Sequence, residues 1–240
     1  MLYLVILLLC HVILGADPPS ITDVNFIKTT LEAHNLIRSK VTPTASNMKY
    51  MTWDSDLAKI AKSWTSKCIF DHNTNLLMKG LHPVFSPVGE NLLMGPGTEM
   101  MGITKKWADE VAYYNFDTNG CLTGKMCGHY TQVVWANSYK VGCAATKCPG
   151  SYGFIVACNY GPAGNFRGSK PYHSGVPCSE CPGDQCENNL CKNPQRDGLK
   201  DYSSGCPHST TLNCNLPCLI TVVVLGFLII LNFIMMNTPL

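Results

Sequence analysis

The stretch Gly128-His129-Tyr130-Thr131-Gln132-Val133-Val134-Trp135 has the most specific pattern in this chain. A short loop bounded by Cys121 and Cys127 stands directly before it, and an apolar run follows its histidine. Polar side chains in such surroundings are usually hydrogen-bonded within the fold, so His129 alone is more often a structural residue than a metal ligand. Its meaning depends on which other polar residues fold back toward it.

Two more polar residues lie on helix faces that should be buried. Apolar residues recur at helical spacing from Val24 to Arg38, and His34 lies on that stripe. A further helix is expected from Thr98 to Tyr114, where Glu110 stands three residues after Trp107. A buried carboxylate is costly unless it is paired, and a histidine is an obvious partner for Glu110. The residues expected to face inward on that helix are Ile103, Trp107, Val111 and Tyr114.

Glu90 is the fourth polar residue of this kind, between Pro87 and an apolar pair. Two imidazoles and two carboxylates suit a divalent cation, although they fall short of a closed structural zinc site with four direct ligands. The periodicity does not show that the four side chains converge, and each taken singly is more often structural.

The remaining elements indicate a layered fold. A helix is expected from Ser55 to Cys68, with Asp54 or Ser55 as N-cap and Cys68 ending the buried stripe. Strands are expected at Lys140–Thr146 and Phe154–Tyr160. Helices on either side of a small sheet would form an α/β sandwich.

Composition limits the class of protein. The chain has 240 residues, a net charge of +2 and 46% hydrophobic residues, which excludes wholesale disorder and disfavours nucleic-acid binding through a basic surface. Fourteen cysteines indicate an oxidising compartment. There is no internal repeat and no Asn-x-Ser/Thr acceptor for N-glycosylation.

The N-terminal end reads as a secretory signal peptide, residues 1–16. Met1 to Leu14 is apolar and small residues follow it. The alternative is a retained membrane anchor, but the run is shorter than the roughly 20 residues that span a bilayer.

The C-terminal tail, residues 216–240, is apolar and lacks a basic flank. This favours a glycosylphosphatidylinositol signal cleaved near Ser203-Ser204-Gly205 over a transmembrane helix, and both remain open. Losing Cys10 with the signal peptide, and Cys206, Cys214 and Cys218 with the tail, would leave ten cysteines, which can pair completely. The competing account pairs Cys206 with Cys214 and leaves Cys218 for acylation.

Residues 173–196 form a cysteine-dense extension before a linker at 197–215. Four cysteines lie between Cys178 and Cys191, in a segment too short to bury its own core. Its Cys-x-x-Cys spacing could hold zinc, but disulfides are favoured in a secreted chain.

Four segments together resemble the signatures of the CAP superfamily, which comprises cysteine-rich secretory proteins, antigen 5 and pathogenesis-related proteins. The extension and the hydrophobic tail are similar to its glioma pathogenesis-related group. The segments are GHYTQVVW at 128–135, IVACNYGPAGN at 155–165, HNLIR at 34–38 and GENL at 89–92.

The resemblance implies an α+β fold, a CAP-type α-β-α sandwich over residues 17–172 with a central cleft. In that family His34, Glu90, Glu110 and His129 would line the cleft as a tetrad, and His34 and His129 would bind a divalent cation, often zinc. The channel-regulating domain that follows the hinge in some members is absent. The disulfides it implies are Cys68–Cys148, Cys121–Cys127, Cys143–Cys158, Cys178–Cys186 and Cys181–Cys191.

Three functions follow as hypotheses. An open metal with bound water could make a hydrolase, but no motif marks Ser39, Ser86 or Ser138 as a nucleophile. The preferred prediction is a non-enzymatic secreted or cell-surface recognition protein that contacts a cell-surface protein or a lipid. The resemblance implies roles such as gamete interaction, defence or sterol binding. For lipid binding, an adaptable apolar patch could include Met94, Met100 and Met101, although methionines at that spacing are more often core.

Overall fold

The computed structural model describes residues 17–150 and 153–198, so the predicted signal peptide, most of the linker and the hydrophobic tail lie outside it. The chain divides into two units, Met1–Ser203 and Ser204–Leu240, and only the first contains described residues. In the described part, no helix combines the length and apolar character that crossing a membrane requires. The helices are α2 (Val24–Arg38), α3 (Ser55–Thr65), α4 (Met100–Ala108), the 3-10 turn η1 (Asp109–Tyr113), α5 (Gly128–Val133) and α6 (Pro194–Asp197).

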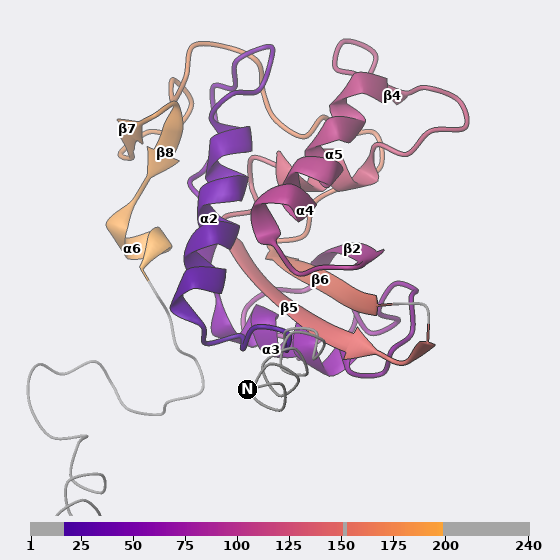
Figure 1. Cartoon of the computed structure of the whole chain (residues 1–240). Helices are drawn as coiled ribbons and strands as arrows, with labels where there is room; N and C mark the ends of the chain where they lie inside the picture. The colour runs from indigo at the N-terminus through magenta and orange to yellow at the C-terminus, as the bar shows by residue number, and fades with distance from the viewer. Residues whose placement is uncertain (1–16, 151–152, 199–240) are drawn as a thin grey trace, which may run out of the picture. The chain divides into compact units, whose positions relative to one another are not determined.

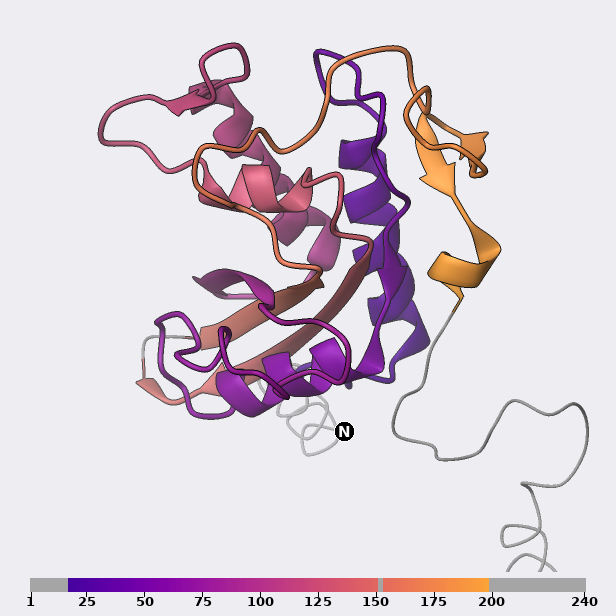
Figure 2. The same cartoon turned by 180° about the vertical axis from the view of Figure 1, so that it is seen from behind.

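A four-stranded sheet forms the middle layer, in the order β1-β5-β6-β2. The strands β5, β6 and β2 are antiparallel, and β1 pairs with β5 in parallel. The helix α3 covers one face, and α2, α4 and α5 lie on the other (Figure 1, Figure 2). This is the α-β-α sandwich that the sequence predicted. The strands of this sheet are β1 (Thr52–Trp53), β2 (Gly89–Gly95), β5 (Lys140–Cys148) and β6 (Gly153–Gly161).

Small residues let the helical layers approach the sheet closely. Ala144, Ala145 and Ala157 on β5 and β6 are fully buried. A Cβ built on Gly142 would lie within 2.6 Å of the backbone carbonyl carbon of Leu57 in α3. Only glycine therefore fits where α3 crosses β5.

The helix α3 begins where the sequence predicted and ends earlier. Asp54 is its N-cap and accepts hydrogen bonds from the backbone N–H groups of Asp56 and Leu57. The last helical residue is Thr65, so the prediction that Cys68 ends the helix is wrong. Cys68 has a φ of 55°, in the left-handed region, and its bridge to Cys148 joins the turn after α3 to the end of β5.

The predicted helix Thr98–Tyr114 is also shorter than expected. The α-helix α4 ends at Ala108, and η1 continues the chain with three residues per turn instead of 3.6. This changes which side chains face the core. Ile103 and Trp107 are buried as predicted, but Val111 is 46% exposed, so its predicted inward orientation is wrong.

Five disulfides join the described cysteines: Cys68–Cys148, Cys121–Cys127, Cys143–Cys158, Cys178–Cys186 and Cys181–Cys191. Cys143 and Cys158 lie directly opposite each other on β5 and β6, so their bridge ties the middle of the sheet. The Cys121–Cys127 bridge closes the loop that carries the hairpin β3 (Tyr114–Asn115) and β4 (Gly120–Cys121) to the start of α5. Cys10, Cys206, Cys214 and Cys218 lie outside the described residues.

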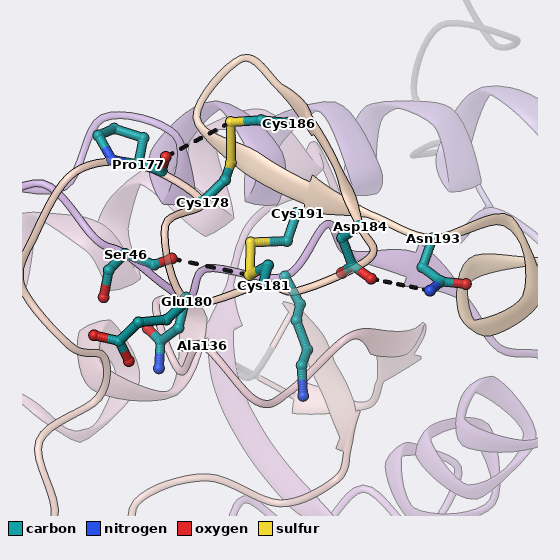
Figure 3. Close-up of a disulfide and its surroundings, with 12 residues drawn as sticks. Ser46, Ala136, Pro177, Cys178, Glu180, Cys181, Asp184, Cys186, Cys191 and Asn193 are labelled. Carbon is teal, nitrogen blue, oxygen red and sulfur yellow. Dashed lines mark hydrogen bonds between the residues drawn. A yellow bond between two sulfur atoms is a disulfide. The ribbon is translucent and has the colours of Figure 1, made fainter.

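The cysteine-dense extension packs beside α2 as the strands β7 (Gln185–Glu187) and β8 (Leu190–Lys192) and the helix α6 (Figure 2). Its backbone is hydrogen-bonded to residues 46–50: Glu180 N–H donates to Ser46, Cys191 N–H to Met48, and Tyr50 N–H to Cys191. Figure 3 shows its two disulfides, Cys181–Cys191 beside Ser46 and Cys178–Cys186 beside Pro177. The cysteines are thus used for disulfides, as the sequence favoured, and not as zinc ligands.

Two buried cations fix neighbouring segments. Lys140, at the start of β5, donates from Nζ to the carbonyls of Asp197 and Gly198, which attaches the end of the extension to the sheet. Arg38, at the end of α2, is fully buried, and burial lowers its pKa to about 9. Its guanidinium joins the segment before β1 to the end of α5 and the turn that follows, by donating to five backbone carbonyls, those of Lys49, Val133, Trp135, Ala136 and Ser138.

Candidate functional site: two histidine–carboxylate pairs at the sheet edge

His129 and Glu110 form a tight pair at the start of α5. The Nδ1 of His129 donates to Glu110 Oε1 at 2.6 Å, and the backbone N–H groups of His129 and Tyr130 donate to Oε2. Burial raises the pKa of the Glu110 carboxyl, but these hydrogen bonds outweigh burial and lower the pKa overall. Trp107 stacks on the imidazole, with ring centroids 6.2 Å apart. Both side chains are partly exposed. The hydrogen bond to Glu110 therefore holds the imidazole in one orientation at the surface.

The second pair joins Glu90 to His72, a residue that the sequence did not single out. The Nδ1 of His72 donates to Glu90 Oε1 at 2.9 Å, and the backbone N–H of Asn73 donates to the same oxygen. The Glu90 side chain is almost completely buried, whereas that of His72 is 61% exposed. The hydrogen bond to Glu90 raises the pKa of His72 above its ordinary value of 6.5.

His34 does not have the place that the resemblance implied. It is fully buried between α2 and the sheet, and both ring nitrogens are used. Nδ1 donates to the Thr30 carbonyl at 2.7 Å, and Nε2 accepts from the Tyr160 hydroxyl at 2.9 Å. Burial lowers its pKa to about 4. A neutral histidine with no accessible lone pair cannot coordinate a cation from solvent, so the expectation that His34 lines the cleft as a ligand is wrong.

The two pairs lie on opposite sides of the edge strand β2. Glu90 and Asn91 are neighbours in this strand, so their side chains point to opposite faces of the sheet. Glu90 meets His72, in the segment that follows α3. Asn91 Nδ2 donates to the backbone carbonyl of His129 at 3.0 Å, in the layer of α5. One pair therefore lies on the α3 side of the sheet edge, and the other lies on the α5 side.

Each pair offers one imidazole oriented by one carboxylate, which is not the donor set of a closed metal site with four direct ligands. Each imidazole uses Nδ1 to bond a carboxylate, and within the described residues no hydrogen bond is made by Nε2 of His72 or His129. A carboxylate behind Nδ1 is the arrangement that orients metal-binding histidines. In the described residues, His72, Glu90, Glu110 and His129 do not supply three ligating atoms that all lie within 4.8 Å of one another. The group that does, Cys181, Asp184 and Cys191, contains two cysteines already joined in a disulfide.

Among residues 17–150 and 153–198, no serine is hydrogen-bonded to this site as a nucleophile would be. In the described residues, neither His72 nor His129 has a serine hydroxyl among its hydrogen-bond partners. Ser138 is fully buried, and its hydroxyl donates to the Pro162 carbonyl. Ser39 donates to the Leu36 carbonyl on the surface of α2.

An apolar groove of about 610 Å³ runs between α2 and α4. Leu36, Ile37, Met101 and Val111 contribute to its walls, and Lys40 and Lys105 also line it. The three methionines suggested from the sequence do not form one patch there. Met100 is buried in the core, Met94 lies on β2 outside the groove lining, and only Met101 lines the groove.

Comparisons with known proteins agree with this architecture. The family model "CAP: Cysteine-rich secretory protein family" matches residues 31–160. GLIPR1-like protein 1 of Bos taurus is 46% identical over 94% of this chain and 97% of its own length. Glioma pathogenesis-related protein 1 of Mus musculus is 48% identical over 78% of this chain and 72% of its own length. The solved "Crystal structure of NaASP2 with Zn2+" has a TM-score of 0.60 and 31% identity, over 74% of this chain and all of that one.

Proposed function

This chain belongs to the CAP family of cysteine-rich secretory proteins, and we propose that it is a non-enzymatic recognition protein that works outside the cell and binds a divalent cation through His72 and His129. The observation that carries the proposal is the pair of imidazoles, each oriented by a carboxylate through Nδ1. Zinc is the first candidate, because imidazole suits it and the NaASP2 structure is described with Zn2+.

The cation would have a structural effect in addition to its chemistry. His72 follows α3 on one face of the sheet, and His129 begins α5 in the layer on the other. A cation held by both Nε2 atoms would link the two helical layers across the edge strand β2. With two protein ligands, water completes the coordination shell, and such sites bind weakly and reversibly.

Titration of the full-length chain with Zn2+ tests the cation site. We expect His72→Ala and His129→Ala each to weaken binding by at least about tenfold, because each removes a direct ligand. His173→Ala is the matched control, since His173 also bonds a carboxylate, Glu180, through Nδ1. Zinc affinity that survives both substitutions, or that falls equally in the control, would contradict the proposal. Zinc-dependent turnover of an ester or a peptide would indicate that the protein is a hydrolase and not a non-enzymatic recognition protein.

Lipid binding is the second candidate function, and the apolar groove between α2 and α4 favours it. Its volume of about 610 Å³ is in the range of small-molecule sites, and its walls are mostly hydrocarbon. Saturable uptake of a sterol or an acyl chain that Met101→Asp abolishes would support this role. Uptake unchanged by that substitution would oppose it.

We also propose that the chain is exported and held at the outer face of the plasma membrane. Five disulfides in the described residues support an oxidising compartment. Attachment through residues 216–240 remains a prediction, because that segment lies outside the described residues. Release from cells by a phosphatidylinositol-specific phospholipase would indicate a lipid anchor, and retention would indicate a spanning helix.

A further inference from the structure

Two adjoining hollows lie on either side of Phe166, on the surface formed by the turn after α5 and residues 162–173. Their volumes are about 440 Å³ and 310 Å³, and both are lined by Trp135, Phe166 and Ser169. We call the two hollows together the Phe166 site. Neither histidine of the two pairs lines it.

The charge of the Phe166 site is positive. Lys49 and Lys170 line the larger hollow and Lys125 lines the smaller one, while no aspartate or glutamate of the described residues lines either. His173 also lines the larger hollow, and its Nδ1 donates to Glu180, which stands outside the lining. An anionic ligand would therefore meet cations without a competing carboxylate in the walls.

The remaining polar lining consists of side-chain amides and hydroxyls, which both donate and accept hydrogen bonds. A bare inorganic anion can use only the donors of such a surface. A ligand with many hydroxyl groups can use donors and acceptors, so the lining suits a polyhydroxylated molecule. The residues concerned are Asn47, Asn137 and Ser169 in the larger hollow, and Asn119, Thr131, Asn165 and Ser169 in the smaller one.

Phe166 is held in a fixed and exposed position between the hollows. Its neighbour Asn165 has a φ of 57°, in the left-handed region that asparagine adopts more readily than most other residues with a side chain. Two hydrogen bonds maintain this conformation: Asn165 Nδ2 donates to the Gly128 carbonyl at 2.8 Å, and Thr131 Oγ1 donates to Asn165 Oδ1 at 2.7 Å. Phe166 is 52% exposed as a residue, and its ring meets Trp135 edge-on. A rigid exposed aromatic ring offers an apolar face on which the ring of a sugar can pack.

We propose that the Phe166 site binds an acidic oligosaccharide, with one sugar unit in each hollow, the Phe166 ring between them, and the lysines facing carboxylate or sulfate groups. The proposal rests on the recognition role proposed above and names a class of partner for it. An outward-facing protein meets such saccharides on cell surfaces.

Binding of defined oligosaccharides to the full-length chain tests the proposal. The probes are a sulfated hexasaccharide, a sialylated oligosaccharide of similar length and a neutral one. We expect one of the acidic probes to bind, and the neutral probe to bind at least about tenfold more weakly. The acidic probe that binds more tightly shows whether the site prefers sulfate or carboxylate groups. Phe166→Ala and the double variant Lys125→Gln/Lys170→Gln should each lower the affinity by about tenfold or more.

Matched controls separate the site from general electrostatics. Phe70→Ala removes another exposed phenylalanine, and Lys28→Gln/Lys59→Gln removes the same charge from surface helices; both should leave the affinity unchanged. Equal losses in these controls, or no binding of either acidic probe, would overturn the proposal. The variant His72→Ala/His129→Ala should still bind the saccharide. Zinc binding that persists when saccharide binding fails therefore removes this inference and leaves the cation site standing.

Discussion

His34 shows how burial alone sets the chemistry of a side chain. It donates to Thr30 and accepts from Tyr160, which fixes one neutral tautomer. A proton added to Nε2 would lose the bond from the Tyr160 hydroxyl and leave a charge in the core. Burial accordingly lowers its pKa to about 4.

This shift makes stability depend on pH in a definite direction. A histidine whose pKa is lower in the folded state stabilises the fold fully above the ordinary value of 6.5, and this contribution is lost as the pH falls from 6.5 toward 4. The loss should be about 3 kcal/mol in unfolding free energy. Denaturant unfolding of His34→Asn over this range should show a correspondingly smaller decrease, and the exposed His173→Asn should keep the decrease. The same decrease in unfolding free energy with pH in His34→Asn and in the unchanged chain would contradict this account.

The sequence predicted three of the four candidate-site residues that the structure places in two pairs. The apolar stripe correctly put His34 on a buried face, and that burial is the reason it cannot be a ligand. His72 lies in an irregular loop with no periodicity, and its contact with Glu90 forms only in the tertiary structure. The available signal was the polar run Asp71-His72-Asn73 directly after the α3 region, with a histidine at a loop position where functional residues concentrate.

At the scale of elements, the central contact is between α3 and β5. Ala58 of α3 is fully buried, and its neighbour Leu57 approaches Gly142 so closely that no side chain fits there. The two elements are also tied by the bridge from Cys68, after α3, to Cys148 on β5.

Gly142→Ala should therefore separate α3 from the sheet. The added methyl group has only backbone atoms to displace, and overpacking of this kind costs about 3 kcal/mol or more. Gly97→Ala is the matched control, because a Cβ at Gly97 has no atom of the described structure within 4 Å. Thermal unfolding should show a large drop in Tm for the first variant and little change for the second. Equal Tm values would show that α3 moves away without cost.

Element types were predicted better than element ends. The span Val24–Arg38 was correct, and the two strands carrying Cys143 and Cys158 were found within two residues at each end. The strand β2 was not predicted, because its Gly-Glu-Asn start lacks the apolar alternation of a strand. The transition from α4 to the 3-10 turn η1 has no breaker residue to mark it, so the periodicity was extended too far.

At the scale of the whole molecule, an ion-pair cluster fastens the extension. Arg196 of α6 pairs with Asp184 and Asp197, and its Nη2 donates to the Cys191 carbonyl at 2.6 Å. Composition set the extension apart in the sequence. Its hydrogen-bonded contact with residues 46–50 was not predictable, since that segment shows no strand pattern.

Arg196→Met should loosen the extension while the disulfides keep it folded. Hydrogen–deuterium exchange at residues 184–198 should become faster by about tenfold, which corresponds to the loss of one partly buried charged cluster. Lys192→Met is the control, because it also removes one positive charge from the extension but leaves the Arg196 cluster intact. Unchanged exchange in Arg196→Met would mean that the backbone bonds to residues 46–50 suffice.

The bond from Lys140 to Gly198 has a mechanical consequence. Tension applied to the chain beyond residue 198 would first load the contact between Gly198 and a lysine rooted in the central sheet. If that contact yielded, the load would pass to the ion pairs of Arg196 with Asp184 and Asp197, and then to Cys191, whose covalent link to Cys181 limits further extension. A pull from the C-terminal side would thus be resisted first by polar contacts and then by a covalent bond that keeps the extension from unravelling.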